Sequence, residues 1–422
     1  MIETISLLPG VTLRCCRDLR FKQGLLTLQF VRPLTAGEAA YNALLPNVLL
    51  RGTRRHPDLR SITQHLDTLY GAAVGAISRR VGDYQTTGIS CGFMEDRFAL
   101  PGDRVLAPML DFLEELLLDF LQEDGGFRVD FVESEKKNLI ATIEAQRNDK
   151  RVYAMDQMLR KLCAKYSYAI PKLGEPEQVA AITPQALLDH YKTILRSAPV
   201  EIFYVGSADP ELIGSRMKAL FGKVSREVLP LPPQSGFQGG DTGDVTETMD
   251  ITQGKLCLGF TTPITNRDPE FPAMQVLNTL FGAGMTSKLF QNVREKLSLC
   301  YSIGSSYYGS KGIVAVSAGV DFDKEPMACQ EILRQLDACR QGQITQAELD
   351  CAREALFSSL RATHDSPGAI ESYYATTAIS GMALTVPEYL QALEQVTVAD
   401  VTAAAKTVEL RVSYFLRGEA NG

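Results

Sequence analysis

The residues best suited to chemistry in this sequence are Arg294 and Tyr301, which follow two glycines, Gly282 and Gly284. The glycines predict a tight turn, and Leu289 with its apolar neighbours predicts a helix that ends near Arg294. The alternating residues that begin at Tyr301 predict a strand. A guanidinium and a phenol would then converge on one edge. Both groups are hydrogen-bond donors, so any ligand at that edge would be held through its acceptors.

The four histidines do not form a metal-binding pattern with one another. They are His56, His65, His190 and His364, and none has a second histidine three to five residues away. A helical zinc site needs two imidazoles about one turn apart. A two-histidine zinc site therefore cannot be assembled locally, and we expect solvated or capping histidines.

The cysteines also lack a pattern that would indicate a metal or a disulfide framework. Nine cysteines are present, an odd number without any Cys-x-x-Cys. Cys15 and Cys16 are adjacent and are expected on opposite faces of one strand. Cysteines without a disulfide pattern are typical of a protein in the reducing cytoplasm, where we expect this one.

Length and composition indicate a globular protein of more than one domain. The chain has 422 residues, 45% hydrophobic and 22% charged, and a net charge of −7. The mild acidity disfavours nucleic acid as a partner. The N-terminus shows no pattern of a secretory signal, and the most apolar stretch, 105–121, is interrupted by acidic residues, so we expect no membrane partner.

Hydrophobic periodicity predicts mixed helices and strands that must position Arg294 and Tyr301. The expected strands cover 11–31, 71–78, 84–93, 201–205, 255–261, 301–308 and 313–319. The expected helices cover 36–50, 58–69, 103–122, 129–146, 152–165, 184–195, 210–221, 269–280 and 286–297.

The order of elements repeats on either side of a segment rich in proline and glycine. Sequences around Thr183 parallel those around Thr397, an offset of 214 residues. Such a period indicates a duplicated domain rather than a solenoid. We predict an α+β fold of two homologous α/β-sandwich domains, 1–230 and 248–422, each a mostly antiparallel sheet with helices packed on it, joined by a linker at 231–247.

The segment 281–302 resembles the C-terminal half of the M16, or pitrilysin and insulinase-like, zinc peptidases. In that family an Arg and a Tyr form a pair that holds substrate carbonyls beside the zinc, and the matching residues here are Arg294 and Tyr301. Alone, an arginine near a helix end and a tyrosine opening a strand have ordinary structural explanations. The match of the whole segment favours the substrate-binding interpretation.

The same resemblance shows a zinc motif that has been lost. Active members carry His-x-x-Glu-His on a first-half helix, with a further Glu as third ligand. Here Ala43 and Asn47 stand at the histidine positions, Pro46 at the catalytic Glu and Thr142 at the distant ligand. The resemblance therefore implies no metal, no cofactor and no catalytic residue in this chain.

In the family, a subunit with a degenerate motif can partner a zinc-bearing subunit. We expect this chain to be such a non-catalytic subunit, binding a peptide or protein substrate and forming a heterodimer with a related zinc peptidase. It is similar to paired M16-like proteins of Gram-positive bacteria, including a zinc-less one associated with the 5-aminopentanol modification of elongation factor P. The alternatives are a scaffold or core subunit of a larger complex, and a self-associating, homodimeric peptide-binding chamber.

Overall fold

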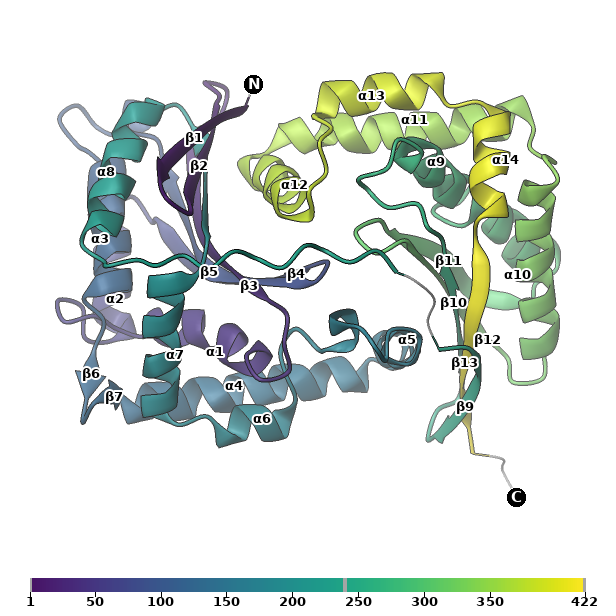
Figure 1. The fold of residues 1–422 in the computed structure, drawn as a ribbon, viewed down its shortest axis with the longest axis horizontal. Helices are drawn as coiled ribbons and strands as arrows, with labels where there is room; N and C mark the ends of the chain where they lie inside the picture. Colours follow the sequence, from purple (N-terminus) through teal and green to yellow (C-terminus); the bar gives the residue numbers. More distant parts are fainter. Residues whose placement is uncertain (1, 238–240, 420–422) are drawn as a thin grey trace. The chain divides into compact units, whose positions relative to one another are not determined.

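The computed structural model describes residues 2–237 and 241–419, which form two compact units (Figure 1). The first unit takes the chain up to Glu144, with 170–233 and 363–376. The second takes 145–169, 234–362 and the chain from Thr377 onward. Each unit thus contains a segment that comes from the other half of the sequence.

The first unit is built on a six-stranded sheet with strand order β1-β2-β8-β3-β5-β4. Neighbouring strands are antiparallel except β2 and β8, which are parallel. The strands are β1 (Ile2–Leu8), β2 (Val11–Arg17), β3 (Gln23–Pro33), β4 (Ala73–Val81), β5 (Tyr84–Met94) and β8 (Val200–Gly206). Two short strands, β6 (Gln122–Glu123) and β7 (Gly126–Phe127), pair separately.

The helices of this unit begin where the sequence supplies caps. The side chains of Asp58, Thr183 and Asp209 each accept a hydrogen bond from a first-turn backbone N–H. The helices are α1 (Ala39–Leu49), α2 (Leu59–Thr68), α3 (Leu106–Leu118), α4 (Val129–Asn148), α6 (Pro176–Ala181), α7 (Pro184–Ser197) and α8 (Pro210–Gly222), with a 3₁₀ turn η1 (Asp96–Phe98). In the described ranges, no helix has the length and apolarity needed to cross a bilayer.

Strand β3 is buried on both faces, which its alternating sequence explains. Leu26 and Leu28 face the main core of the unit, whereas Thr27 and Gln29 both donate to Glu371 at 3.0 Å. Glu371 comes from helix α12 (Pro367–Ser380), the segment contributed by the second half of the sequence. The polar face of β3 is therefore a docking surface for α12 rather than a solvated face.

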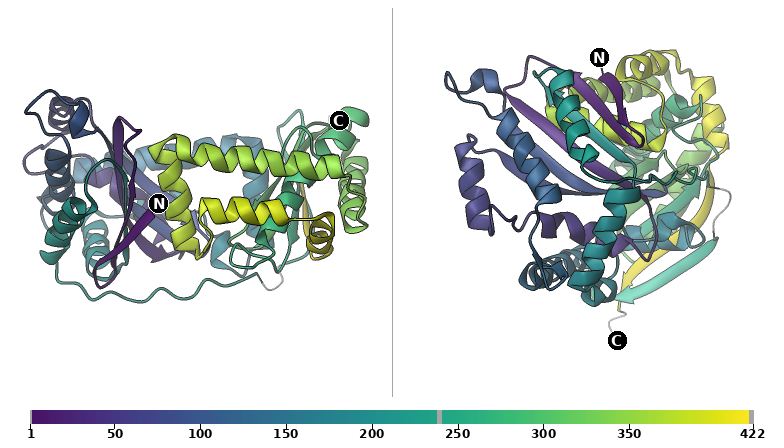
Figure 2. Two further views of the ribbon diagram at one scale, coloured as in Figure 1. Left: turned by 90° about the horizontal axis from the view of Figure 1, so that it is seen from above. Right: turned by 60° about the vertical axis from the view of Figure 1, so that its left-hand side comes forward.

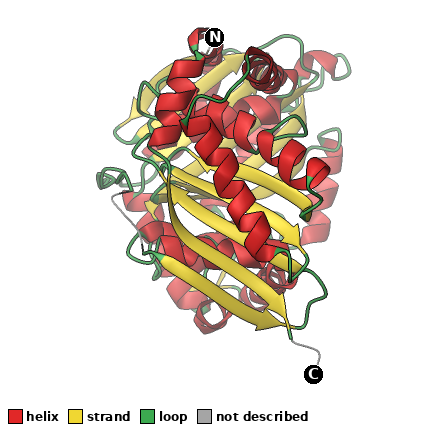
Figure 3. Cartoon of the chain, turned by 90° about the vertical axis from the view of Figure 1, so that its right-hand side faces the viewer, coloured by secondary structure: helices red, strands yellow, loops and turns green. Residues whose placement is uncertain are grey.

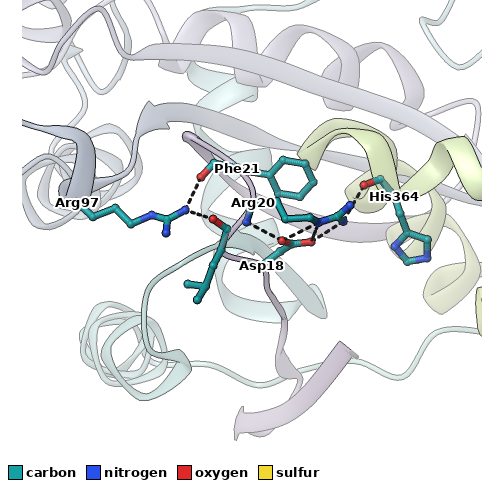
Figure 4. A network of polar contacts seen from close by, with 6 residues as sticks. Asp18, Arg20, Phe21, Arg97 and His364 are labelled. Atoms are coloured by element: carbon teal, nitrogen blue, oxygen red, sulfur yellow. Dashed lines mark hydrogen bonds and ion pairs between the residues drawn. The ribbon is translucent and has the colours of Figure 1, made fainter.

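A surface network holds the chain that leads into α12. Arg20 pairs with Asp18 at 2.7 Å and donates to the carbonyl of His364 at 3.0 Å, while Arg97 bonds the carbonyls of Leu19 and Phe21 (Figure 4). His364 lies in the 3₁₀ turn η4 (Thr363–Asp365) that precedes α12. The hydrogen bond from Arg20 is accepted by the backbone carbonyl of His364 and does not involve the imidazole.

The second unit has a five-stranded sheet with order β11-β12-β10-β13-β9. Its strands are among those drawn in yellow in Figure 3. The strands are β9 (Gly243–Met249), β10 (Gly254–Thr261), β11 (Cys300–Tyr308), β12 (Ile313–Val320) and β13 (Glu409–Gly418), of which β9 and β13 pair in parallel. Its helices and turns are α5 (Lys150–Leu162), η2 (Ser167–Ala169), α9 (Phe271–Phe281), η3 (Leu289–Lys296), α10 (Glu325–Arg340), α11 (Gln346–Ala362), α13 (Val386–Gln395) and α14 (Val398–Lys406).

Helix α5 comes from the first half of the sequence and packs against β10 and β13 of this second unit. Met158 and Leu162 of α5 lie so close to Gly259 of β10 that a Cβ there would contact them at 2.5 and 3.2 Å. On the helical side of the unit, α11 and α13 lie side by side (Figure 2). The two halves of the sequence thus each give one helical segment to the other unit.

The predicted α+β class is confirmed, with helices packed on sheets in both units. Thr183 and Thr397, the positions from which the repeat was inferred, both cap helices, α7 and α14. The exact domain boundaries and the linker at 231–247 remain predictions, and 238–240 lie outside the described residues. The helix expected at 286–297 is present at 289–296, where it has the wider winding of a π-helix.

Candidate functional site

The loop before Arg294 is shaped by a close approach between Gly282 and strand β11. A Cβ at Gly282 would lie 2.6 Å from the hydroxyl of Ser305 and 2.8 Å from Leu289. The carbonyl of Gly282 accepts from the Ser305 N–H at 3.0 Å. Gly284 has a φ of +134°, a conformation that glycine adopts without strain. Both glycines therefore fix where the following helix begins.

Arg294 lies on the last turn of the π-helix η3, an uncommon element that recurs at functional sites. Ser287 holds the start of this segment, since its hydroxyl donates to the carbonyl of Gly284 at 2.7 Å and accepts from the Phe290 N–H at 3.3 Å. At the other end the N–H of Leu297 bonds the carbonyl of Asn292, five residues back.

Arg294 and Tyr301 line one cavity of about 380 Å³. The side chain of Arg294 is 39% exposed and lies over the Phe290 ring, with Glu295 at 3.6 Å, while Tyr301 is 60% exposed. The remaining lining residues are Ser298, Leu299, Cys300, Asp321 and Lys324. The substrate-binding role of the two residues is not tested by this geometry and stays a prediction.

The sequence did not single out Asp321 and Lys324, which complete the polar wall. The Tyr301 hydroxyl donates to Asp321 at 2.8 Å, and the Lys324 ammonium lies 3.0 Å from the same carboxylate. Cys300 pairs with Val320 across the β11–β12 hairpin. Counting back along the register of Ser302–Tyr308 places Asp321 opposite Cys300, one residue from Tyr301, so the register could have indicated this neighbour.

Contacts between Tyr301, Asp321 and Lys324 determine the protonation states of the groups that line the cavity. The hydrogen bond to Asp321 raises the pKa of Tyr301, and the bonds from Lys324 and Tyr301 lower the pKa of Asp321. Burial raises the pKa of the adjacent Cys300 thiol to about 11. At neutral pH the phenol and the thiol keep their protons, so the cavity offers hydrogen-bond donors and no thiolate nucleophile.

The positions that match the zinc motif do not fit a metal ion. Ala43 and Pro46 are buried within α1, and the amide of Asn47 donates to the carbonyl of Ala43 at 3.1 Å. Thr142 on α4 is exposed, and its hydroxyl donates to the carbonyl of Asn138 at 2.9 Å. None of these side chains is an imidazole or a carboxylate.

The carboxylates of α4 do not replace the missing ligands. Glu135 accepts from Arg51 and from Asn138, both at 3.2 Å. Glu144, expected to be a solvated charge, is exposed. Within residues 2–237 and 241–419, no group of three or more His, Cys, Asp or Glu side chains is arranged to hold a metal.

Two histidines that are distant in sequence are neighbours in the fold. The rings of His56 and His65 lie 4.5 Å apart, and His56 Nδ1 is 2.8 Å from Glu115, which also bonds Thr53. His190 is not solvated as expected, since its Nε2 contacts Asn42 at 2.8 Å and burial lowers its pKa to about 4. His56, His65 and His190 therefore have partners within the fold.

Comparisons with known proteins relate the chain to M16 peptidases and to an inactive metalloprotease. Residues 181–356 match the family described as "Peptidase M16 inactive domain". The chain is 28% identical over 409 residues to a probable inactive metalloprotease, YmfF, of Bacillus subtilis, covering 97% of this chain and 96% of that protein.

Solved structures share the fold over the whole chain. A conserved protein from Enterococcus faecalis superposes with a TM-score of 0.93 at 26% identity, covering 100% of this chain and 99% of the other. A peptidase M16 inactive domain from Pseudomonas fluorescens gives 0.82 at 18% identity, covering 99% and 98%. These comparisons show that the chain is M16-like, with residues 181–356 matching the inactive domain of that family.

Proposed function

We propose that this protein is the non-catalytic subunit of a two-subunit zinc peptidase, and that it holds the peptide substrate with Arg294 and Tyr301. One observation carries the proposal: the residues of the zinc motif have been replaced, whereas the Arg–Tyr pair is kept on the wall of an open cavity. A zinc-bearing relative would supply the metal and the base. This chain would contribute two donors to the substrate.

The chemistry of the cavity supports a binding role. Arg294 and Tyr301 are both hydrogen-bond donors with part of their surface in solvent. Donors aimed at a peptide carbonyl also stabilise negative charge that develops on that oxygen during hydrolysis. Asp321 orients the phenol but is itself bound to Lys324, so it is not a free base.

The experiment is a peptidase assay with a zinc-bearing M16 relative from the same cell. The relative and this chain are assayed separately and mixed, and activity is expected only in the mixture. Arg294→Ala and Tyr301→Phe should each lower kcat/KM by about ten-fold or more, the loss expected when a transition-state hydrogen bond of roughly 1.5–3 kcal/mol is removed.

Lys296→Ala is the matched control, because Lys296 is a second exposed cation on the same π-helix. It should retain the activity of the mixture. Full activity in Arg294→Ala and Tyr301→Phe would refute the binding role. Self-association with no effect of any zinc-bearing relative would instead favour a homodimeric chamber, and a stable complex without any peptidase activity would favour a scaffold.

The cytoplasmic location and the connection with elongation factor P stay predictions from the sequence. A pull-down from the native cell tests the partner, because a zinc-bearing M16 relative should be recovered with this chain.

A further inference from the structure

A second cavity of the second unit has none of its described lining residues in common with the Arg–Tyr cavity. Its volume is about 750 Å³, and it is lined by the loop before α9, the first turn of α9 and residues of α13 and α14. Helix α9 packs against both α13 and α14 (Figure 1). Small-molecule sites have volumes of about 300–1,000 Å³ and often lie between helices. The cavity therefore has the size of a site for a small organic molecule.

The deeper wall of this cavity is apolar and shielded from water. Ile264, Ala273, Val396 and Ala404 line the cavity and are buried. An apolar group that enters the cavity is removed from water, which favours binding. A flat protein surface would not reach these recessed side chains, whereas a small molecule with an apolar body can enter.

The loop on one side of the cavity is held in place before any ligand binds. The hydroxyl of Tyr307 donates to the carbonyl of Ile264 at 2.7 Å. Prolines restrict the backbone, and three of them line the cavity: Pro263, Pro269 and Pro272. The cavity is thus pre-formed, so a ligand does not have to order the loop on binding.

The ionisable groups of this cavity are acidic. Asp268, Glu270 and Asp400 line it, and none of the described lining residues is Lys, Arg or His. The hydroxyls of Thr265 and Thr397 donate to Asp268 and Asp400, both at 2.7 Å. The bonds from Thr397 lower the pKa of Asp400, which is therefore ionised at neutral pH. No ion pair between described residues neutralises any of the three carboxylates.

The helix ends at the cavity carry partial charges of both signs. The C-terminal end of α13 and both ends of α14 contribute lining residues, and so does the N-terminal end of α9. Each helix end carries roughly half an elementary charge, positive at the N-terminus and negative at the C-terminus. These contributions largely cancel, so the carboxylates determine the sign of the potential and favour a cation.

We propose that this cavity binds a small organic amine, with its apolar body against the buried wall and its protonated nitrogen near the three carboxylates. The site goes beyond the proposed function, because it uses neither Arg294 nor Tyr301. Helix α9 begins at this cavity and ends at Gly282, the glycine that approaches β11. The amine would therefore bind at one end of the helix that leads into the Arg–Tyr site.

The test compares three probes that share a phenylbutyl body and differ in charge. At neutral pH phenylbutylamine is a cation, phenylbutanol is neutral and phenylbutyrate is an anion. Their Kd values for the full chain are measured by ligand-observed NMR titration at 0.15 M salt, where screening limits charge effects to about 8 Å. The amine should bind roughly ten-fold more tightly than the alcohol, because a charge-assisted hydrogen bond is stronger than a neutral one. Phenylbutyrate should bind more weakly than the alcohol.

Variants with matched controls locate the binding. The double variant Asp268→Asn, Glu270→Gln removes two lining charges and should abolish most of the preference for the amine over the alcohol. Ala403→Leu, at an exposed lining position of α14, fills part of the cavity and should weaken binding of both probes. Glu394→Gln and Ala347→Leu, at exposed helical positions outside the lining, should bind both probes like the wild type.

Four results would overturn the proposal. These are equal binding of the amine and the alcohol, tighter binding of phenylbutyrate, no binding of the amine by the wild type, and amine binding that no lining substitution weakens. Thermal unfolding shows whether each variant is folded, and the charge variant and the filling variant test the site independently. Failure here leaves the proposed function intact, since that function is tested at Arg294 and Tyr301.

Discussion

At the scale of single residues, the candidate site works through donors whose protonation is fixed by their neighbours. Tyr301 keeps its proton because it donates to Asp321, and Asp321 stays ionised because Lys324 and Tyr301 both donate to it. The phenol therefore stays protonated across the neutral range, and it must release Asp321 before it can donate to a peptide carbonyl. Asp321 is best described as a positioning residue.

The first prediction concerns that contact. Asp321→Asn removes the negative charge that raises the pKa of Tyr301, so this pKa should fall toward its ordinary value. The change is measured by NMR of tyrosine labelled at the ring carbon, with Tyr301→Phe to assign the signal. An unchanged titration of Tyr301 would show that the hydrogen bond does not form.

The second prediction concerns His190. Burial lowers its pKa from 6.5 to about 4, so the unfolded chain binds a proton more readily than the folded protein does. Stability should be complete above pH 6.5 and should decline as the pH falls toward 4, by roughly 3 kcal/mol at most. His190→Gln keeps a donor for Asn42 without titrating, so its urea unfolding should lose less stability across this window. Identical pH profiles would contradict the assignment.

At the scale of elements, the site depends on a close contact between the glycine loop and β11. Gly282→Ala would press a Cβ against Ser305 and Leu289, at a cost of about 1–3 kcal/mol. Gly222→Ala serves as the control, because a Cβ at the end of α8 meets nothing within 4 Å. Urea unfolding compares the two. Equal stability of both variants would mean that the loop can move away from β11.

The element that joins the second half of the sequence to the first unit is α12, and Glu371 anchors it. Arg79 donates to both oxygens of Glu371 at 3.0 and 2.9 Å, and Thr27 and Gln29 also donate to it. Glu371→Ala leaves these buried donors unpaired and should destabilise the protein by about 3 kcal/mol. Glu354→Ala, at an exposed position of α11, should change stability by less than about 0.5 kcal/mol. A loss below 1 kcal/mol at Glu371 would show that water replaces these bonds.

The elements could be predicted largely because their periodicity and caps are local. The helix predicted at 184–195 is present as α7, which Thr183 caps. The π-helix at 289–296 could not be distinguished from an α-helix, because the apolar residues Leu289 and Val293 fit either winding. The pairing of His56 with His65 and the contact of Glu371 with β3 are tertiary, so no local pattern reveals them.

At the scale of the whole molecule, the duplicated sequence is folded with a reciprocal exchange. The segment 145–169 belongs to the second unit and 363–376 to the first. Their helices α5 and α12 start 217 residues apart, at Lys150 and Pro367, close to the 214-residue offset of the repeat. The duplication could be read from the sequence, but the exchange could not, because it depends on which sheet each helix meets.

The central claim is that this chain keeps residues for holding a peptide after losing those for binding zinc. The most direct measurement is the zinc content of the isolated chain after equilibration with zinc, by mass spectrometry, together with peptide hydrolysis with and without a chelator. The account predicts well under one zinc per chain and no chelator-sensitive hydrolysis. One zinc per chain, with hydrolysis that the chelator abolishes, would contradict it.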